Sequence, residues 1–477
     1  MSGIETGDVI DGFVVGEKLH TGGMARIHRV THPDLAAPLV MKSPRLAEGE
    51  DPAAIVSFEM EQMILPRLSG PHCPKIYAVG DFTAKPYIVM EHIQGESLFA
   101  SLPHLPLAPE TVAYMAAKTA QALDSLHRQN VIHLDVKPSN IMIRETGEAV
   151  LIDFGLAHHT DLPDLMREEF RLPYGTAPYM APEQVLGARS YRRSDLFALG
   201  VLMYFFATGA RPFGDPQSLK GLKRRLWEDP DPPRRLNDAI PPWLQEVILR
   251  CLEVDPAERY PTAAQLAFDL NHPDQVALTA RAAKTSRDGW LARANRRRRN
   301  EKAAPIQKLA TQSMFAQAPI VAVAVDLGDG AAELHAALRT ELKRILGALP
   351  MARVACLNVL KLKTMQADTT LDEDGQNKHL QRLLELKRWA EPLKLGQGKI
   401  TFHVLEATKP ADAILSYARA NHVDHIVMGA RGESAMRRLL GSVSAEVAAH
   451  APCSVTVTRL REWKPLEEEQ TFHASAD

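Results

Sequence analysis

The sequence predicts two folded regions of different class. The first is an α+β region, strand-rich over residues 13–92 and helical over residues 96–272. The second begins near residue 319 and is an α/β region, because strands and helices alternate there as they do in a doubly wound parallel sheet. A length of 477 residues, at roughly 150 residues per domain, leaves room for about three domain-sized units.

In the first region, short apolar runs between turn residues predict strands, and apolar residues at three- and four-residue steps predict helices. The predicted strands are residues 13–15, 25–31, 38–42 and 87–91, with one helix at residues 53–68. The predicted helices of the second part are residues 109–130, 243–252 and 263–270. Leu196–Ala207 is the longest nearly apolar run. It is shorter than the ~20 residues that a membrane span needs, so we interpret it as a buried core helix.

The second region alternates regularly between the two kinds of element. Its predicted strands are residues 320–325, 354–359, 400–405, 424–428 and 454–458. Its predicted helices are residues 331–346, 380–390, 411–421 and 444–450. Residues 461–477 are polar, and we interpret them as a tail.

A basic segment separates the two regions. Residues 281–302 hold nine Lys and Arg against two acidic residues and lack an apolar face, so we interpret residues 273–318 as a basic linker. The run Arg296–Arg299 raises an alternative, a regulator that contacts nucleic acid or another polyanion through this segment. We favour a solubilising tether.

Composition narrows the class of protein further. Lys and Arg number 56 and Asp and Glu 58, for a formal charge of -2, which argues against a generally basic nucleic-acid-binding surface. The four cysteines have no CxxC spacing, which excludes a disulfide scaffold and a cysteine zinc site. Because no signal peptide or membrane span is visible, we expect a soluble, cytoplasmic protein.

Four pieces of the first region carry the chemistry: Lys42 at the end of an apolar strand, Val131–Asn140 (VIHLDVKPSN), Leu151–Gly155 (LIDFG) and Ala181–Glu183 (APE). Transfer of a γ-phosphoryl group needs divalent metal on the phosphates, a positive anchor and a carboxylate that orients the hydroxyl. Asp135 and Asn140, five residues apart on one loop, can serve the nucleophile and a metal ion. Asp153 completes a metal site, since Mg²⁺ prefers carboxylate and phosphate oxygens.

Residues 12–272 resemble a bacterial eukaryotic-like (Hanks-type) serine/threonine protein kinase. HxDxKPxN, DFG, APE and DPxxR occur in the order and spacing of that family, after a strand that ends in lysine. The resemblance implies the two-lobed protein kinase fold, with an N-lobe at about 12–92 and a C-lobe at about 93–272. It also implies ATP and Mg²⁺ or Mn²⁺ as cofactors, and serine or threonine of protein substrates as the acceptor.

By this resemblance, Asp135 orients the substrate hydroxyl and accepts its proton, while Lys137 steadies the γ-phosphate. Asn140 and Asp153 would hold the metal ions. Lys42 would pair with the α- and β-phosphates and with Glu61, Glu59 being the alternative register. The ATP-binding set is completed by Gly22, Gly23 and Ile27 of the glycine loop and by Met90, Glu91 and Ile93 of the hinge. The structural motif residues are His133, Phe154, Gly155, Glu183, Asp195 and Arg259, with Glu183 paired to Arg259 and Asp195 anchoring the catalytic loop.

The glycine loop departs from the family pattern. His20 and Ala25 stand where the family has glycines, which let backbone N–H groups approach phosphate without an obstructing Cβ. We expect reduced rather than absent ATP binding. This departure also motivates an alternative, a catalytically weak or dead kinase-fold scaffold that binds nucleotide in stress signalling.

Leu134 is a second departure, because many kinases carry arginine before the catalytic Asp. That arginine normally pairs with a phosphate on the activation segment, here Asp153 to Glu183, and leucine cannot. The segment also offers few hydroxyls, among them Thr160 and Thr176. We therefore hypothesise that activity does not depend on phosphorylation of this segment.

The C-terminal region has one strong local motif, Val427–Gly432 (VMGARG) followed by Gly441-Ser442. A glycine turn after a strand and a Gly-Ser at a helix start are typical of a phosphate-binding arrangement. Residues 319–460 resemble a universal stress protein domain. That resemblance implies nucleotide binding or homodimerisation through the last strand. The tentative nucleotide site comprises Asp326, Gly429, Gly432, Gly441 and Ser442. The gap from Gly432 to Gly441 holds eight residues, one fewer than in the family's ATP-binding members.

Overall fold

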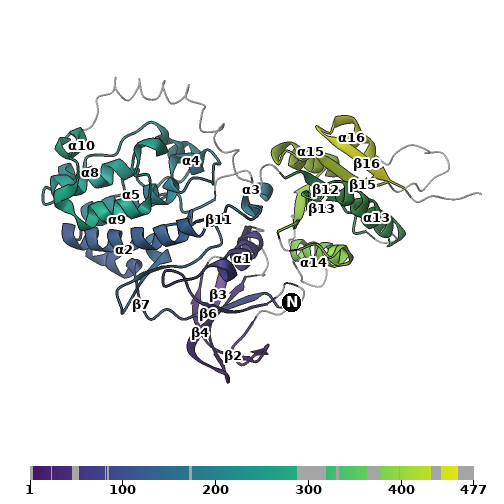
Figure 1. Cartoon of the computed structure of the whole chain (residues 1–477), viewed down its shortest axis with the longest axis horizontal. Helices are drawn as coiled ribbons and strands as arrows, with labels where there is room; N and C mark the ends of the chain where they lie inside the picture. The colour runs from purple at the N-terminus through teal and green to yellow at the C-terminus, as the bar shows by residue number, and fades with distance from the viewer. Residues whose placement is uncertain are drawn as a thin grey trace, which may run out of the picture. The chain divides into compact units, whose positions relative to one another are not determined.

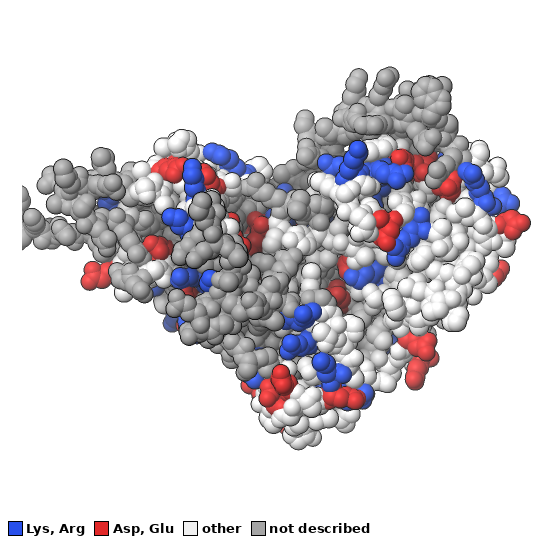
Figure 2. All heavy atoms as spheres, turned by 180° about the vertical axis from the view of Figure 1, so that it is seen from behind, with Lys and Arg blue, Asp and Glu red and all other residues white. Residues whose placement is uncertain are grey.

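The computed structural model describes residues 4–286 and 318–459, apart from residues 23, 46–52, 81, 83–84, 171–173, 329–331, 363–376, 397 and 431–441. The chain divides into two compact units, residues 1–318 with 367–384, and residues 319–366 with 385–477. Acidic and basic side chains lie interspersed on the described surface in Figure 2, as the near-zero net charge leads one to expect.

The first unit begins with an antiparallel sheet in the order β1-β2-β3-β4-β6-β5 (Figure 1). Its strands are β1 Val9–Ile10, β2 Phe13–Thr21, β3 Ala25–His32, β4 Leu35–Pro44, β5 Ile76–Gly80 and β6 Tyr87–Glu91. Alternating apolar residues of these strands pack into one core that includes Phe13, Val30 and Met41. Helix α1 (Ala53–Ile64) follows β4, and a single 3-10 turn, Leu65–Arg67, continues it.

A helical lobe follows the sheet. Its long helices are α2 Pro109–Arg128, α5 Arg193–Thr208, α8 Pro242–Cys251 and α9 Ala263–Asn271. Helix α2 packs against α5 and α9, and α5 packs against α8. Thirteen of the sixteen residues of α5 are buried, which confirms the prediction of a core helix for the apolar run at 196–207. In the described part of the chain, no helix combines the length and apolar character needed to cross a membrane.

Short helices and strands precede, separate and follow these long helices. The short helices are 3-10 Leu98–His104, α3 Leu165–Glu169, α4 Pro182–Val185, α6 Leu219–Leu222, 3-10 Lys223–Leu226, α7 Pro233–Leu236 and α10 Ala280–Ala283. The short strands are β7 Gly95–Ser97, β8 Val131–Ile132, β9 Ile141–Arg144, β10 Ala149–Leu151 and β11 His158–His159. Strand β11 pairs with β8, so the chain after Asp153 runs beside the strand that leads into the catalytic loop.

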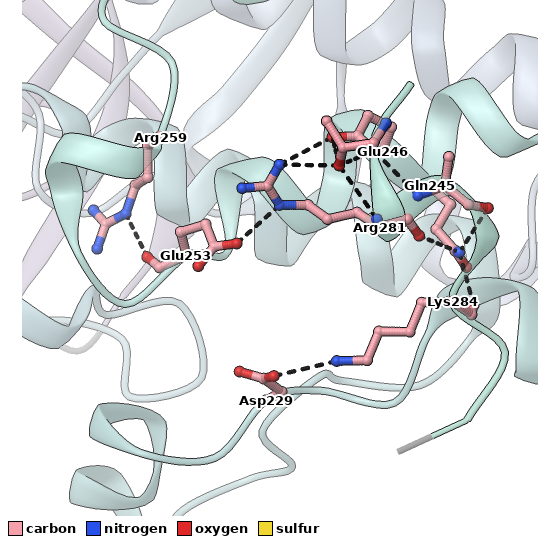
Figure 3. Close-up of polar contacts among 9 residues, drawn as sticks. Asp229, Gln245, Glu246, Glu253, Arg259, Arg281 and Lys284 are labelled. Atoms are coloured by element: carbon pink, nitrogen blue, oxygen red, sulfur yellow. Dashed lines mark hydrogen bonds and ion pairs between the residues drawn. The ribbon is translucent and has the colours of Figure 1, made fainter. Parts of the chain in front are cut away.

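Residues 279–284 pack on α8, although the sequence placed them in the basic linker (Figure 3). The buried side chain of Gln245 donates to the carbonyls of Arg281 and Lys284, at 2.7 and 2.9 Å. The carboxylate of Glu246 accepts from the backbone N–H of Thr279 and of Ala282, at 3.0 and 3.1 Å. Two adjacent side chains of α8 thus bind the main chain of this segment, and the compact lobe extends past residue 273.

The second unit is a five-stranded parallel sheet in the order β14-β13-β12-β15-β16. Its strands are β12 Ile320–Ala324, β13 Arg353–Lys361, β14 Ile400–Ala407, β15 His425–Gly429 and β16 Ser454–Thr458. Its helices are α13 Ala332–Ala348, α14 Lys378–Ala390, α15 Pro410–Ala420 and α16 Ser442–His450. Helices α13 and α14 contribute to one apolar layer and α15 and α16 to the other, so both faces of the sheet are covered. The predicted α/β doubly wound fold is confirmed.

Candidate active site

A cleft of about 660 Å³ in the first unit is lined by most of the residues that the sequence assigned to catalysis, ATP binding and metal binding. The strands contribute Ile27, Lys42 and Glu91, and the chain after β6 contributes Ile93. The lining residues from the loops of the helical lobe are Asp135, Lys137, Asn140, Asp153 and Thr176. Lys42 and Thr176, which are 134 positions apart in the sequence, therefore line one cavity.

Lys42 lies at the centre of a triad of charges. Its Nζ donates to Glu61 Oε2 at 2.6 Å and to Asp153 Oδ1 at 2.9 Å. Lys42 comes from β4, Glu61 from α1, and Asp153 from the loop after β10. Of the two registers considered for the α1 carboxylate, the structure places Glu61 against the lysine.

Electrostatics keeps Lys42 and Asp153 of this triad charged. Burial alone would lower the pKa of Lys42, but Asp153 and Glu61 together hold that pKa well above its usual value. Lys42 in turn lowers the pKa of Asp153 to about 2, so this carboxylate is ionised at neutral pH. Burial raises the pKa of Glu61, against the opposing attraction of Lys42. Asp153 keeps 47% of its side-chain surface exposed in the cleft and can accept a further ligand.

The two residues after Asp153 are tied to α1. The ring of Phe154 is fully buried, and its centroid lies 5.1 Å from that of the His133 ring. The backbone N–H of Phe154 donates to Glu61 Oε1 at 3.3 Å. A Cβ on Gly155 would lie 2.0 Å from Ser57 Oγ, so only glycine fits there. The close approach of this loop to α1 gives a packing reason for the glycine of the DFG motif.

One buried carboxylate binds the backbone of the catalytic loop. Asp195, fully buried at the start of α5, accepts from the backbone N–H of His133 at 2.9 Å and of Leu134 at 2.8 Å. His127 Nε2 lies 2.8 Å from the same carboxylate. Leu134 has φ 61°, in the left-handed region that costs a non-glycine residue roughly 1–2 kcal/mol. These hydrogen bonds hold the loop in that conformation.

Asp135 is oriented by donors on both of its oxygens. Oδ1 accepts from the Thr176 N–H at 3.1 Å and from Thr176 Oγ1 at 2.8 Å. Oδ2 accepts from Lys137 Nζ at 2.6 Å and from Asn140 Nδ2 at 3.0 Å. Thr176 also accepts from Lys137 Nζ at 3.0 Å, so the activation segment and the catalytic loop share one network.

Glu183 and Arg259 form a second buried anchor. Arg259 Nη1 and Nη2 donate to the two carboxylate oxygens of Glu183 at 2.7 and 2.9 Å, and both side chains are fully buried. The Arg259 Nε donates to the carbonyl of Glu253 at 2.7 Å (Figure 3). This pair fixes the end of the activation segment to the helical lobe.

The glycine loop and the hinge lie along the cleft. The Gly22 N–H donates to the Ala25 carbonyl at 2.9 Å and closes the turn between β2 and β3, while Gly23 lies outside the described residues. Met90 lies on β6 and pairs with Val40 of β4. The Glu91 carboxylate is bound by Arg144 of β9 at 2.5 and 3.0 Å. Sequence reasoning missed Arg144, because no motif links it to the hinge.

The tentative second nucleotide site is only partly described. Asp326 follows β12 and accepts from the N–H of Gly328 at 3.1 Å, Gly429 ends β15, and Ser442 begins α16. Gly432 and Gly441 lie outside the described residues, as does the run Arg296–Arg299. A Cβ on Gly429 would lie 2.7 Å from Leu334, which gives this glycine a packing reason. Nucleotide binding here and dimerisation through β16 stay predictions.

Comparison with known proteins now decides the family. The model of the protein kinase domain matches residues 13–271, more than half of the chain. The chain belongs to the protein kinase family. The model of the universal stress protein family matches residues 318–459, so this kinase carries a universal stress protein domain after its kinase domain. Both resemblances that the sequence predicted are confirmed.

Named relatives are bacterial serine/threonine-protein kinases. PknB of Mycolicibacterium smegmatis is 33% identical over 266 residues, which cover 54% of this chain and 42% of that protein. PknB of Mycobacterium leprae is 32% identical over 266 residues, with the same coverage of 54% and 42%. The chain spans less than half the length of these curated relatives. The crystal structure of the Mycobacterium tuberculosis PknI kinase domain is 23% identical, with a TM-score of 0.44, and the match covers 56% of this chain and 99% of that one.

Proposed function

We propose that this chain is an ATP-dependent serine/threonine protein kinase and that Asp135 is its catalytic base. One observation carries the proposal: the Lys42–Glu61–Asp153 triad and the Asp135–Lys137–Asn140 loop line the same cleft. These are the charges that phosphoryl transfer needs, a cation for the phosphates, oxygen donors for metal and a carboxylate for the nucleophile.

The donor set fits a Mg²⁺ or Mn²⁺ ion. Asp153 offers an exposed, ionised carboxylate and Asn140 an amide oxygen, and hard divalent cations prefer oxygen ligands of this kind. These two residues would hold the metal, which when bound neutralises charge on the phosphates. Lys42, already oriented by Glu61, would contact the α- and β-phosphates.

Asp135 would act on the acceptor hydroxyl. Its carboxylate is held by Thr176, Lys137 and Asn140, so the oxygen that faces the hydroxyl is pre-oriented and can accept its proton. Lys137 would steady the transferred phosphoryl group. The intact charge set supports an active enzyme over the alternative of a dead kinase-fold scaffold.

The test is transfer of radiolabel from γ-labelled ATP to a generic serine- and threonine-containing protein. The full chain is compared with Asp135→Asn, which keeps the size of the side chain but removes its charge and one of its two acceptor oxygens. We expect label on the substrate for the unaltered chain and, for the variant, a loss of about 10²–10⁴-fold, the usual contribution of a general base. Equal labelling by both proteins would exclude the proposed role of Asp135. No label from either would favour the scaffold.

A further inference from the structure

A buried ion pair joins the activation segment to the chain after α4 at a place that no kinase motif marks. Arg189, just after α4, donates from Nε to Asp164 Oδ2 at 2.8 Å and to Oδ1 at 3.1 Å. Its Nη2 donates to the carbonyl of Leu156 at 2.8 Å. The two side chains are 11% and 10% exposed, so the pair is largely removed from water.

Asp164 joins three parts of the segment. Its Oδ1 accepts from the N–H of Arg167 at 3.2 Å and so caps α3. His158 Nδ1 of β11 lies 3.4 Å from Oδ2. Burial lowers the pKa of His158, so its imidazole is neutral at pH 7 and Arg189 is left as the cation that faces the carboxylate. Burial opposes ionisation of Asp164, but Arg189 and the capped N–H keep its pKa below the usual value.

The elements that this pair joins support the catalytic machinery. Strand β11 pairs with β8, whose last residue, Ile132, immediately precedes the catalytic loop. Helix α3 packs against α1, which carries Glu61. By fixing β11 and α3, the pair Asp164–Arg189 therefore acts on the catalytic loop on one side of the cleft and on α1 on the other.

In other kinases a phosphate bound by the arginine before the catalytic Asp supplies this kind of tie. Here that position is Leu134, a buried side chain without charge. The pair Asp164–Arg189 has the same chemistry, a guanidinium bound to an anion, but the anion belongs to the chain itself.

We propose that Asp164 and Arg189 are positioning residues that hold residues 153–170 of the activation segment in place without a phosphate group. The proposal rests on the proposed kinase function, which it extends to regulation. Because the carboxylate is permanent, the phosphorylation step that orders such segments elsewhere is not required.

The experiment uses the full chain, treated with phosphatase, in five forms: unaltered, three single variants and one double variant. Arg189→Ala removes the cation. Asp164→Asn removes only the negative charge, because asparagine caps helices as well as aspartate does. Arg128→Ala is the control, since it breaks an exposed pair with Asp124 on α2. Each form is measured for the rate of phosphoryl transfer and the KM for ATP, and for hydrogen exchange of the amides of residues 156–169.

We expect the unaltered chain to transfer phosphate and to protect these amides after dephosphorylation. Arg189→Ala and Asp164→Asn should each lower kcat by about tenfold, the size of a strong side-chain coupling, with little change in KM for ATP. Both should speed exchange over residues 156–169, whereas Arg128→Ala should match the unaltered chain. The double variant Asp164→Arg with Arg189→Asp should regain part of both properties.

Three results would overturn the proposal. The first is hydrogen exchange over residues 156–169 that is as slow in Asp164→Asn and Arg189→Ala as in the unaltered chain. The second is a fall in kcat without faster exchange in these variants, and the third is rapid exchange in the dephosphorylated unaltered chain. If the unaltered chain transferred no phosphate, the kinase function would fail, but hydrogen exchange would still decide whether the pair holds the segment.

Discussion

The two units of this chain bury different kinds of side chain. The kinase unit buries charged groups, among them Lys42, Glu61, Asp195 and the pair Glu183–Arg259. The described part of the C-terminal unit packs mainly aliphatic side chains in two layers over the faces of its sheet, with Arg353 as a buried charged residue. Buried charges are costly unless they are paired, so natural chains keep them where function or a specific geometry needs them. The contrast supports placing the proposed phosphoryl transfer in the first unit.

The largest effect should come from breaking the anchor of the activation segment. Replacing Arg259 by leucine leaves the Glu183 carboxylate fully buried without its cation. Loss of one partner of a buried pair costs about 3–5 kcal/mol, so we expect the kinase unit to unfold at much lower urea concentration. Circular dichroism in urea measures this. Arg344→Ala, at an exposed pair of the C-terminal unit, is the control and should change stability by less than about 0.5 kcal/mol. Equal effects of the two changes would refute the account of the anchor.

The C-terminal unit should respond most to loss of volume. Leu342 of α13 is fully buried in one of the two apolar layers. Leu342→Ala should destabilise this unit by about 2–5 kcal/mol through lost burial and a residual cavity. Phosphoryl transfer assayed below the unfolding transition should stay unchanged. A loss of phosphoryl transfer in the folded variant would show that transfer depends on the packing of the C-terminal unit, contrary to the contrast.

Much of this fold and site could be predicted from the sequence, because both rest on local patterns. Strand–helix alternation predicted all five strands of the parallel sheet. The kinase motifs placed Asp135, Asn140 and Asp153 in one site, because their spacing is fixed by short loops. Strand β5 was missed, since its five residues between a proline turn and Gly80 show no clear alternation.

Contacts between residues outside the family motifs could not be predicted. The distant pair Glu183–Arg259 was predicted because both residues belong to kinase motifs, whereas Asp164 and Arg189, only 25 residues apart, belong to none. Gln245 and Glu246 bind the main chain of residues 279–284, and main-chain recognition leaves no side-chain pattern to find. The positive charge of that segment instead favoured a linker.

Thr176 tests how the activation segment contributes to the cleft. Thr176→Ala loses hydrogen bonds to the Asp135 carboxylate and from Lys137, each involving a charged group. Such bonds are worth about 1.5–3 kcal/mol, so we expect kcat to fall by about tenfold or more. Thr176→Glu should not restore it, because the hydroxyl acts as a donor to a carboxylate. Rescue by glutamate in a steady-state transfer assay would show instead that this threonine works as a phosphorylation site. Thr160→Ala should leave kcat unchanged.

The acid dependence of stability should be a smaller effect, confined to the kinase unit. Lys42 lowers the folded pKa of Asp153 to about 2, below the ordinary value of 3.8. The stabilisation is therefore present above pH 4 and is lost as the pH falls toward 2. After allowance for solvent screening of this half-exposed carboxylate, it amounts to about 1 kcal/mol. In urea unfolding, Lys42→Met should have a lower free energy of unfolding than the unaltered chain at pH 5, and this difference should shrink toward pH 2.5. A difference that grows at low pH would contradict the pairing of Lys42 with Asp153.

The central claim is that this chain is a kinase whose cleft is assembled without phosphate on the activation segment. The most direct test is the first-turnover rate of the full chain after phosphatase treatment, with and without preincubation in ATP. The account predicts equal rates without a lag for both samples, and transfer far slower in Asp135→Asn. A lag that preincubation removes, together with phosphate found on the segment by mass spectrometry, would contradict it.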